Sequence, residues 1–153
     1  MTPQLRLCWG KDLDAATLYE LLRLRVEVFV IEQRCPYPEL DGRDLVTGTR
    51  HFWLEQDGEV ISTLRLMEEA GAGESGFGTT FRIGRVCTRA DARGNGHTAR
   101  LMRAALADVG ERPCHLNAQS HLAGMYAGHG FAVVGEEFLE DGIPHVPMSR
   151  VPR

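Results

Sequence analysis

Residues 82–102 read RIGRVCTRADARGNGHTARLM, and this stretch indicates both the fold and the kind of site that the chain carries. Its beginning lies within FRIGRVCT, residues 81–88, which has the β-branched and apolar residues typical of a strand. Its end lies within residues 96–108, where apolar residues recur at helical spacing. Between them is a loop with Gly94 and Gly96. The sequence therefore predicts a strand, a glycine-rich loop and a helix in succession.

The composition of this loop suits a bound phosphate group. Glycine lets the backbone approach a ligand closely, and the first turn of a helix offers unpaired N–H groups at the positive end of the helix dipole. Arg93 would add a charge-assisted contact, and residues 92–104 contain no acidic side chain. Because an isolated GxG sequence is more often an ordinary surface turn, the loop alone leaves both interpretations open.

Two other motif interpretations fail on their spacing. GNGHTA fits the GxGxxA form of a dinucleotide-binding loop, but that fold places the glycines directly after its first strand. Here Arg89–Arg93 intervene, and the region from Glu111 to Cys114 does not supply the acidic residue expected about 20 positions later. GESGF fails the GxSxG pattern of hydrolases because Phe77 stands at the final glycine position.

Composition predicts a single soluble domain. The chain has 153 residues, of which 43% are hydrophobic and 25% charged, and no repeat or linker divides it. Its 17 basic and 21 acidic residues give a net charge of −4, which argues against a nucleic-acid partner but not against a small anion site.

Neither a metal site nor a membrane segment is expected. The four cysteines lie far apart without a CxxC pair, and the six histidines show no HxH or HExxH spacing. No stretch approaches the ~20 apolar residues of a membrane helix, and the N-terminus lacks the apolar run of a signal peptide. We expect a cytoplasmic protein with reduced thiols.

The rest of the chain predicts a mixed α/β (α+β) architecture. Asp57-Gly58 between HFWLEQ and EVISTLRLM is the strongest hairpin signal. The other expected elements are a helix within 12–30 that ends near Val26–Ile31, a loop at 35–50, a glycine-rich connection at 71–80, a strand at 113–119, a short helix through Tyr126 and closing strands within 131–142 and 143–150.

The whole arrangement resembles the GNAT superfamily of N-acetyltransferases, in particular its ElaA-like branch. The superfamily signature Q/R-x-x-G-x-G/A matches from Arg93 onward, although Thr98 replaces the last small residue and His97 an apolar one. A second motif, N-x-x-A-x-x-L-Y-x-x-x-G-F, matches at Tyr126, Gly130 and Phe131 but has Gln119 and Leu122 in place of Asn and Ala. Further ElaA-like blocks are LRxxxxVFVxEQ at 22–33, CPYPELDGRD at 35–44, His51, IGRV at 83–86, AQ at 118–119 and EDGIPHVPM at 140–148.

The resemblance implies a single GNAT domain over residues 1–153. Its expected fold is a mixed, mostly antiparallel twisted central sheet of about six to seven strands flanked by about four helices. It also implies acetyl-CoA as cosubstrate, with the pyrophosphate on the N–H groups of 94–98 and the pantetheine arm along the strand at 86–88. The residues expected to bind acetyl-CoA are Val86, Cys87, Thr88, Arg93, Gly94, Asn95, Gly96, His97, Thr98, Gln119 and Tyr126.

The reaction expected from the resemblance is acetyl transfer to a primary amine of a small molecule or a peptide. The amine would attack the thioester directly, with a main-chain N–H near Cys87 stabilising the oxyanion. Tyr126 would protonate the CoA thiolate as general acid. Cys87 itself fits a small apolar strand residue better than a nucleophile. Spacing singles out no base among the family-like carboxylates, which are Glu32, Glu39, Asp41 and Asp141. His51 and His145 are interpreted as hydrogen-bonded structural residues.

Two alternatives stay open at this point. The first is a non-catalytic acyl-CoA-binding or regulatory module on the same fold. The second is an acyl-homoserine-lactone synthase, whose N-terminal pattern is loosely echoed by Arg25, Phe29, Glu39, Asp41 and Asp44, although the chain is short and lacks that family's tryptophan-rich start. The acceptor pocket should form between the N-terminal helical region, residues 35–45 and the C-terminal hairpin. The C-terminal strand could pair with a second chain in a homodimer.

Overall fold

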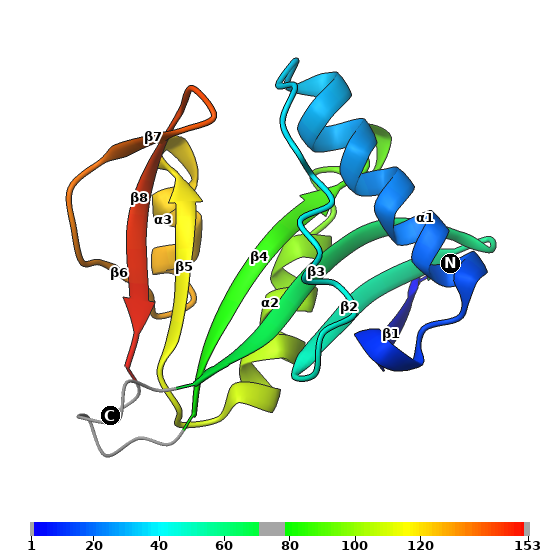
Figure 1. Cartoon of the computed structure of the whole chain (residues 1–153), viewed down its shortest axis with the longest axis horizontal. Helices are drawn as coiled ribbons and strands as arrows, with labels where there is room; N and C mark the ends of the chain where they lie inside the picture. The colour runs from blue at the N-terminus through cyan, green and yellow to red at the C-terminus, as the bar shows by residue number, and fades with distance from the viewer. Residues whose placement is uncertain (1, 71–78, 152–153) are drawn as a thin grey trace.

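The computed structural model describes residues 2–70 and 79–151, and within them eight strands form one sheet (Figure 1). The sheet order is β1-β2-β3-β4-β5-β8-β6, with β7 paired to the far end of β8. The strands are β1 (Gln4–Trp9), β2 (Thr49–Gln56), β3 (Glu59–Ala70), β4 (Thr79–Thr88), β5 (Cys114–Gln119), β6 (Ala132–Val133), β7 (Phe138–Glu140) and β8 (Ile143–Arg150). All the pairs recorded there are antiparallel except β4 with β5. The predicted mixed, mostly antiparallel sheet is confirmed.

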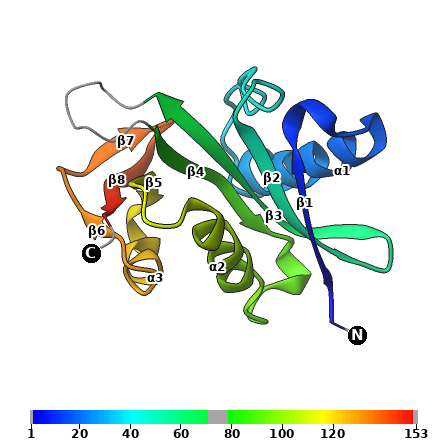
Figure 2. The same ribbon diagram turned by 90° about the horizontal axis from the view of Figure 1, so that it is seen from below.

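Helices cover both faces of the sheet. α2 (His97–Val109) and α3 (Ala123–Ala127) lie on one face, and α1 (Ala15–Arg25) lies on the other, as Figure 2 shows. The larger core lies between the sheet and α2 with α3, and includes Phe81, Leu101 and Leu116. A smaller core beneath α1 includes Leu21 and Trp53. The sheet therefore lies between two layers of helices. A strand side chain in the larger core lies on the α2 and α3 face, and one in the smaller core lies on the α1 face.

The N-terminal helix ends in an unusual way. Asp14 caps α1 by accepting a 2.7 Å hydrogen bond from the Thr17 N–H, and with Asp12 it is one of two aspartates before the apolar run that could cap the helix. After Arg25 the chain continues as a π-helical turn, Val26–Glu32, over the β-branched segment where the helix was expected to give way. Residues 33–48 then form an irregular loop on the α1 side. This loop and α1 supply one wall of the site.

The two predicted hairpins are present. Asp57 and Gly58 both have positive φ, as a tight turn between β2 and β3 requires. A second tight turn, at Asp141 and Gly142, joins β7 to β8. Most of the glycine-rich connection predicted at 71–80 lies outside the described residues, whereas Thr79 and Thr80 begin β4.

Candidate active site

The site originates in an irregularity of β4. The register with β3 shifts between Thr63 and Arg65, and opposite this shift Arg85 adopts a φ of 53°. A bulge of this kind inserts a residue and exchanges the two faces of a strand. Accordingly Ile83 packs into the larger core, while Cys87 packs into the smaller core on the opposite face. The bulge bends β4 at the place where it separates from β5.

Beyond the bulge, the edge of β4 that faces β5 has no strand partner among the residues that the structure describes. The two strands pair only at Phe81 with Cys114 and at Arg82 with His115 in the described part of the sheet. Figure 1 shows β4 and β5 diverging from this point. The Cys87 carbonyl accepts a 3.1 Å hydrogen bond from the Ser62 hydroxyl on the β3 side. Because main-chain groups alternate along a strand, those of Val86 and Thr88 point to the open edge.

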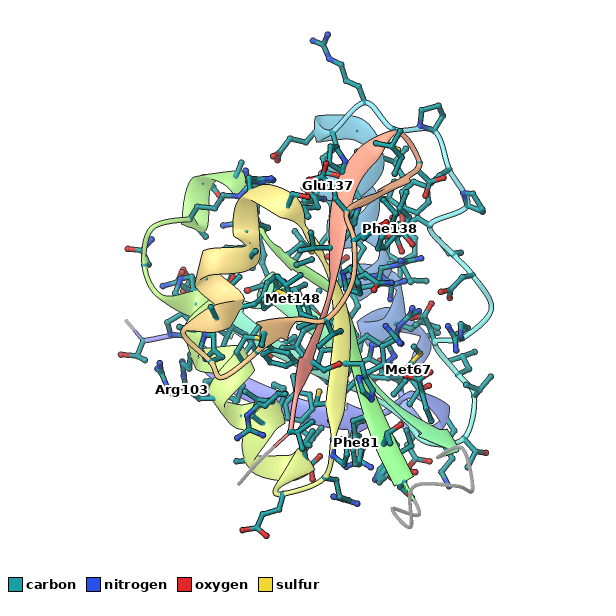
Figure 3. All side chains as sticks on the ribbon, turned by 90° about the vertical axis from the view of Figure 1, so that its left-hand side faces the viewer. Met67, Phe81, Arg103, Glu137, Phe138 and Met148 are labelled. Carbon is teal, nitrogen blue, oxygen red and sulfur yellow. The ribbon has the colours of Figure 1, made fainter. Side chains whose placement is uncertain are left out.

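A cavity of about 360 Å³ occupies the space between the diverging strands. Its wall combines residues from both faces of the sheet: Leu122 and Tyr126 come from the α3 side, whereas Gln119 and His145 come from the α1 side. Figure 3 shows the two faces, with Met148 between β8 and α3 and Phe138 on the other side of β8. The remaining lining residues are Phe29, Gln33, Cys35, Tyr37, Pro38, Asp41, Arg43, Arg65, Met67, Arg82, Ile83, Gly84, Arg85, Val86, Leu116, Asn117, Glu140, Asp141 and Ile143. The cavity therefore passes through the sheet.

The glycine-rich loop lies next to the open edge of β4 and has free main-chain donors. Gly94 and Gly96 have φ values of 82° and 76°, and the space where a Cβ would stand is open at both. α2 begins at His97 without a side-chain cap, and its first helical hydrogen bond runs from Arg100 N–H to the Gly96 carbonyl. The N–H groups of residues 97–99 thus have no helical partner, which is the arrangement that binds anions.

Thr98 departs from the family signature, and the structure gives the reason. Its hydroxyl lies 3.1 Å from that of Thr88, which lies 2.8 Å from that of Ser62. The Ser62 hydroxyl donates to the Cys87 carbonyl, so it accepts from the Thr88 hydroxyl. The Thr88 hydroxyl in turn accepts from that of Thr98. The side chain of Thr98 therefore ties the start of α2 to β4 and leaves its main-chain N–H for a ligand. The Asn95 amide similarly shapes the loop by donating to the carbonyls of Ala92 and Arg93.

Arg93 is already paired in this structure. Its guanidinium donates to both carboxylate oxygens of Glu32, at 2.7 and 2.8 Å, and to the Thr88 carbonyl at 3.0 Å. The hydrogen bonds from Arg93 lower the pKa of Glu32. Arg93 thus links the end of the π-helical turn to the glycine-rich loop. A role in phosphate binding would require it to share or exchange this partner.

Tyr126 reaches the cavity from α3. Its side chain is buried at 6% exposure and packs edge-on against Phe131. Within the described residues, its hydroxyl has no hydrogen-bond partner. Burial and then the nearby Cys87 raise the pKa of Tyr126 to about 12. Burial likewise raises the pKa of Cys87 to about 12, so its thiol stays protonated and is not a nucleophile at neutral pH.

Three of the carboxylates considered as bases belong to ion pairs instead. Glu32 binds Arg93, Glu39 accepts hydrogen bonds from Arg25 and Arg85, and Asp41 forms a two-pronged pair with Arg65. Burial alone would raise the pKa of Asp41, but its hydrogen bonds, mainly from Arg65, outweigh burial and lower it.

The pairs formed by Glu39 and Asp41 belong to one buried network that holds the 33–48 loop against the sheet. Arg25 lies at its centre, at 1% exposure, with Glu39 at 2.7 Å and Asp44 at 2.5 Å. Its other members are Tyr37, Asp41, Arg65 and Arg85. Because Arg85 occupies the bulge, the network connects α1, the loop and the bulge of β4. Sequence reasoning missed Arg65 and Arg85. For Arg25 a signal existed, since it shares the apolar face of its helix with Leu21.

Gln119 lies apart from the glycine-rich loop. It stands opposite His145 across the β5–β8 pair, and its amide donates to Gln33 at 3.3 Å. The predicted cofactor residues therefore fall into two groups. Residues 86–88 and 93–98 surround the open edge of β4, whereas Gln119 lines the cavity from the opposite face to Tyr126.

Residues 2–70 and 79–151 hold no cluster of three or more metal-ligating His, Cys, Asp or Glu side chains. Among the helices of these same ranges, none has the length and apolar character needed to span a bilayer.

An open strand edge beside a glycine-rich helix start is the arrangement expected above for an acetyltransferase. A sequence model of the acetyltransferase (GNAT) domain matches residues 23–151. A UPF0039 protein of Mycobacterium tuberculosis is 66% identical over 98% of this chain and 94% of its own length. The chain belongs to the GNAT acetyltransferase family.

Solved structures agree with this assignment. The crystal structure of Escherichia coli ElaA has a TM-score of 0.86 at 33% identity, over 97% of this chain and 99% of that one. An acyl-CoA N-acyltransferase from Pseudomonas aeruginosa has a TM-score of 0.84 at 41% identity, with the same coverage of 97% and 99%. The predicted GNAT fold and its ElaA-like branch are confirmed.

Proposed function

We propose that this protein transfers the acetyl group of acetyl-CoA to a primary amine of a small molecule or peptide. The observation that carries the proposal is the cavity through the sheet, which joins the open edge of β4 to Tyr126. The pyrophosphate would bind the free N–H groups at residues 94–98, and the pantetheine arm would pair with the outward main-chain groups of Val86 and Thr88. The acetyl thioester would then enter the cavity.

The proposed acetyl transfer requires few catalytic side chains. The amine attacks the carbonyl carbon of the thioester, and an outward N–H of β4 beside Cys87 stabilises the oxyanion. Positioning both reactants in one cavity is worth on the order of 7 kcal/mol in favourable cases. The C–S bond then breaks, and Tyr126, protonated at neutral pH, donates to the CoA thiolate. The neutral, buried thiol of Cys87 supports direct attack over an acyl-enzyme route.

The test is an acetyl-CoA titration followed by an amine panel. Acetyl-CoA is expected to raise the melting temperature of the protein, and at least one amine should release free CoA from the mixture. Failure of millimolar acetyl-CoA to bind would overturn the proposal. Binding without release of CoA from any amine would favour the non-catalytic module, and activity only with acyl-carrier-protein substrates would favour the acyl-homoserine-lactone synthase.

Substituting Gly96 by alanine should weaken acetyl-CoA binding by about tenfold, which is about 1.4 kcal/mol. The new methyl group would stand in the open space before the N–H groups of α2. Gly58→Ala is a matched control, because Gly58 has a φ of 78° and equally open surroundings but lies in the β2–β3 turn. Both variants should lose about 1–2 kcal/mol of stability from the strained φ. Calorimetric titration should find weaker binding for Gly96→Ala alone; equal affinities would argue against the loop as the phosphate site.

A further inference from the structure

The β7–β8 hairpin brings a histidine and a carboxylate together at the wall of the cavity. The tight turn at Asp141 and Gly142 pairs Glu140 with Ile143, and two steps further in the register Phe138 lies opposite His145. As a result Glu140 Oε2 lies 3.4 Å from His145 Nε2. Both residues line the cavity. The tight turn thus determines the geometry of the pair.

The hydrogen bond of the imidazole determines its tautomer. His145 Nδ1 lies 2.7 Å from the carbonyl oxygen of Ile143, which can only accept. Nδ1 therefore carries the proton, and in the neutral ring Nε2 holds the lone pair beside Glu140. The ring is also stacked on Phe138, with 5.9 Å between centroids. A fixed ring whose Nε2 carries the lone pair has the form of a proton acceptor.

Four arginines line the cavity, and within the described residues three of them pair with carboxylates, whereas Arg43 has no recorded ion pair. Asp41 and the cavity-lining arginines Arg65 and Arg85 neutralise one another and Glu39 in the buried network, and Arg82 pairs with Glu69. Gln119, from β5, faces His145 with an uncharged amide. Within the described residues, Glu140 and Asp141 are the cavity carboxylates that no guanidinium contacts. The Glu140 carboxylate, beside His145, is therefore available to a cationic group in the cavity.

We propose that His145 accepts the proton of an ammonium substrate and that Glu140 binds this ammonium group. The inference deepens the proposed function and rests on it. The ammonium donates one N–H to the Glu140 carboxylate and another to Nε2 of His145. Because His145 lies on the α1 face and Tyr126 on the α3 face, the amine is activated on one side of the sheet and the thiolate leaves on the other.

The protons of the proposed transfer balance. His145 takes one proton from the ammonium, and the free amine then forms the C–N bond while the C–S bond breaks. The nitrogen loses a second proton as the amide forms, and this proton restores the phenol of Tyr126 after Tyr126 has protonated the thiolate. One proton per turnover therefore leaves to water through His145, and no further reactant is needed.

The test compares two nucleophiles on the variant His145→Gln, whose amide can still donate to the Ile143 carbonyl. For a primary alkylamine that the wild type accepts, kcat/KM at neutral pH should fall by about 100-fold, the usual scale of a general base. The O-alkylhydroxylamine of the same carbon skeleton has an uncharged nitrogen at that pH, so the variant should stay within a few-fold of wild type. The alkylamine loss should also shrink as the pH approaches the pKa of the amine. His121→Gln, at an exposed position, is the control.

Glu140→Gln provides a second, independent test. The Glu140 side chain is 51% exposed, so the substitution should not affect folding. The variant should raise KM for the alkylamine several-fold and leave the hydroxylamine unaffected. Equal losses for both nucleophiles would mean that His145 and Glu140 are merely structural, and unchanged alkylamine kinetics would overturn the assignment outright. A wild-type protein that binds acetyl-CoA but acetylates nothing would instead overturn the proposed function, and this inference with it.

Discussion

Tyr126→Phe is expected to lower kcat by about 100-fold, equivalent to about 2.7 kcal/mol of transition-state stabilisation. The substitution removes the proton that would reach the CoA thiolate and leaves the ring in place against Phe131. Stability should change little, because the hydroxyl has no hydrogen-bond partner within the described residues. The loss should appear in kcat, while acetyl-CoA affinity stays near that of the wild type. Rates of CoA release at saturating substrate and calorimetric titrations measure the two quantities.

Tyr19→Phe is the matched control for this experiment. It makes the same chemical change at a tyrosine of α1 that is 67% exposed, and it should leave kcat unaltered. If Tyr126→Phe turned over as fast as wild type, the thiolate would have to take its proton from water. A variant that lost acetyl-CoA binding instead would give Tyr126 a packing role rather than an acidic one.

Arg25→Ala should destabilise the protein by about 3–5 kcal/mol, the cost of leaving buried carboxylates without their counter-ion. Glu39 and Asp44 would lose the guanidinium that lies 2.7 and 2.5 Å from their oxygens. Burial opposes the charge of Asp44, and it is chiefly the hydrogen bond from Arg25 that lowers its pKa below the ordinary value. Without Arg25, the 33–48 loop should detach at lower denaturant concentration than the wild-type fold.

Arg23 offers a control two positions away on the same helix. Its side chain is 61% exposed and pairs with Glu20 and Glu27 at the surface. Arg23→Ala should therefore cost no more than about 1 kcal/mol. Urea unfolding of both variants, followed by circular dichroism, tests the difference. Similar midpoints for the two variants would mean that water replaces the lost guanidinium and that the network does not hold the loop in place.

The elements that the sequence predicted correctly are those with strong local signals. The Asp57-Gly58 turn needs positive φ at both positions, and few other dipeptides accept that conformation so readily. α2, at His97–Val109, begins one residue after the predicted start because Gly96 itself is left-handed. By contrast β1 was not predicted. Its residues are mostly exposed, and it forms because β2 offers a free edge, which is information that lies outside the local sequence.

The residues of the candidate site also differ in whether the local sequence could indicate them. The glycine-rich loop and Tyr126 stand in contiguous motifs, so resemblance could indicate them. The bulge at Arg85 depends on pairing with β3, and the ion pairs of Arg65 and Arg85 join segments more than 20 residues apart, as from Arg65 to Asp41. His145 shows the limit most clearly. It was interpreted as structural because its partner Glu140 becomes significant only when the hairpin turns and the cavity forms beside it.

The passage of the cavity through the sheet has a consequence for the order of events. If acetyl-CoA enters along the α2 and α3 face and the amine from the α1 face, neither ligand blocks the entrance of the other. We then expect a ternary complex in which both are bound before transfer, with initial-rate lines that intersect rather than run parallel. CoA should compete with acetyl-CoA but not with the amine. Acceptor preference could thus change through the β7–β8 hairpin while the cofactor half of the protein stays as it is.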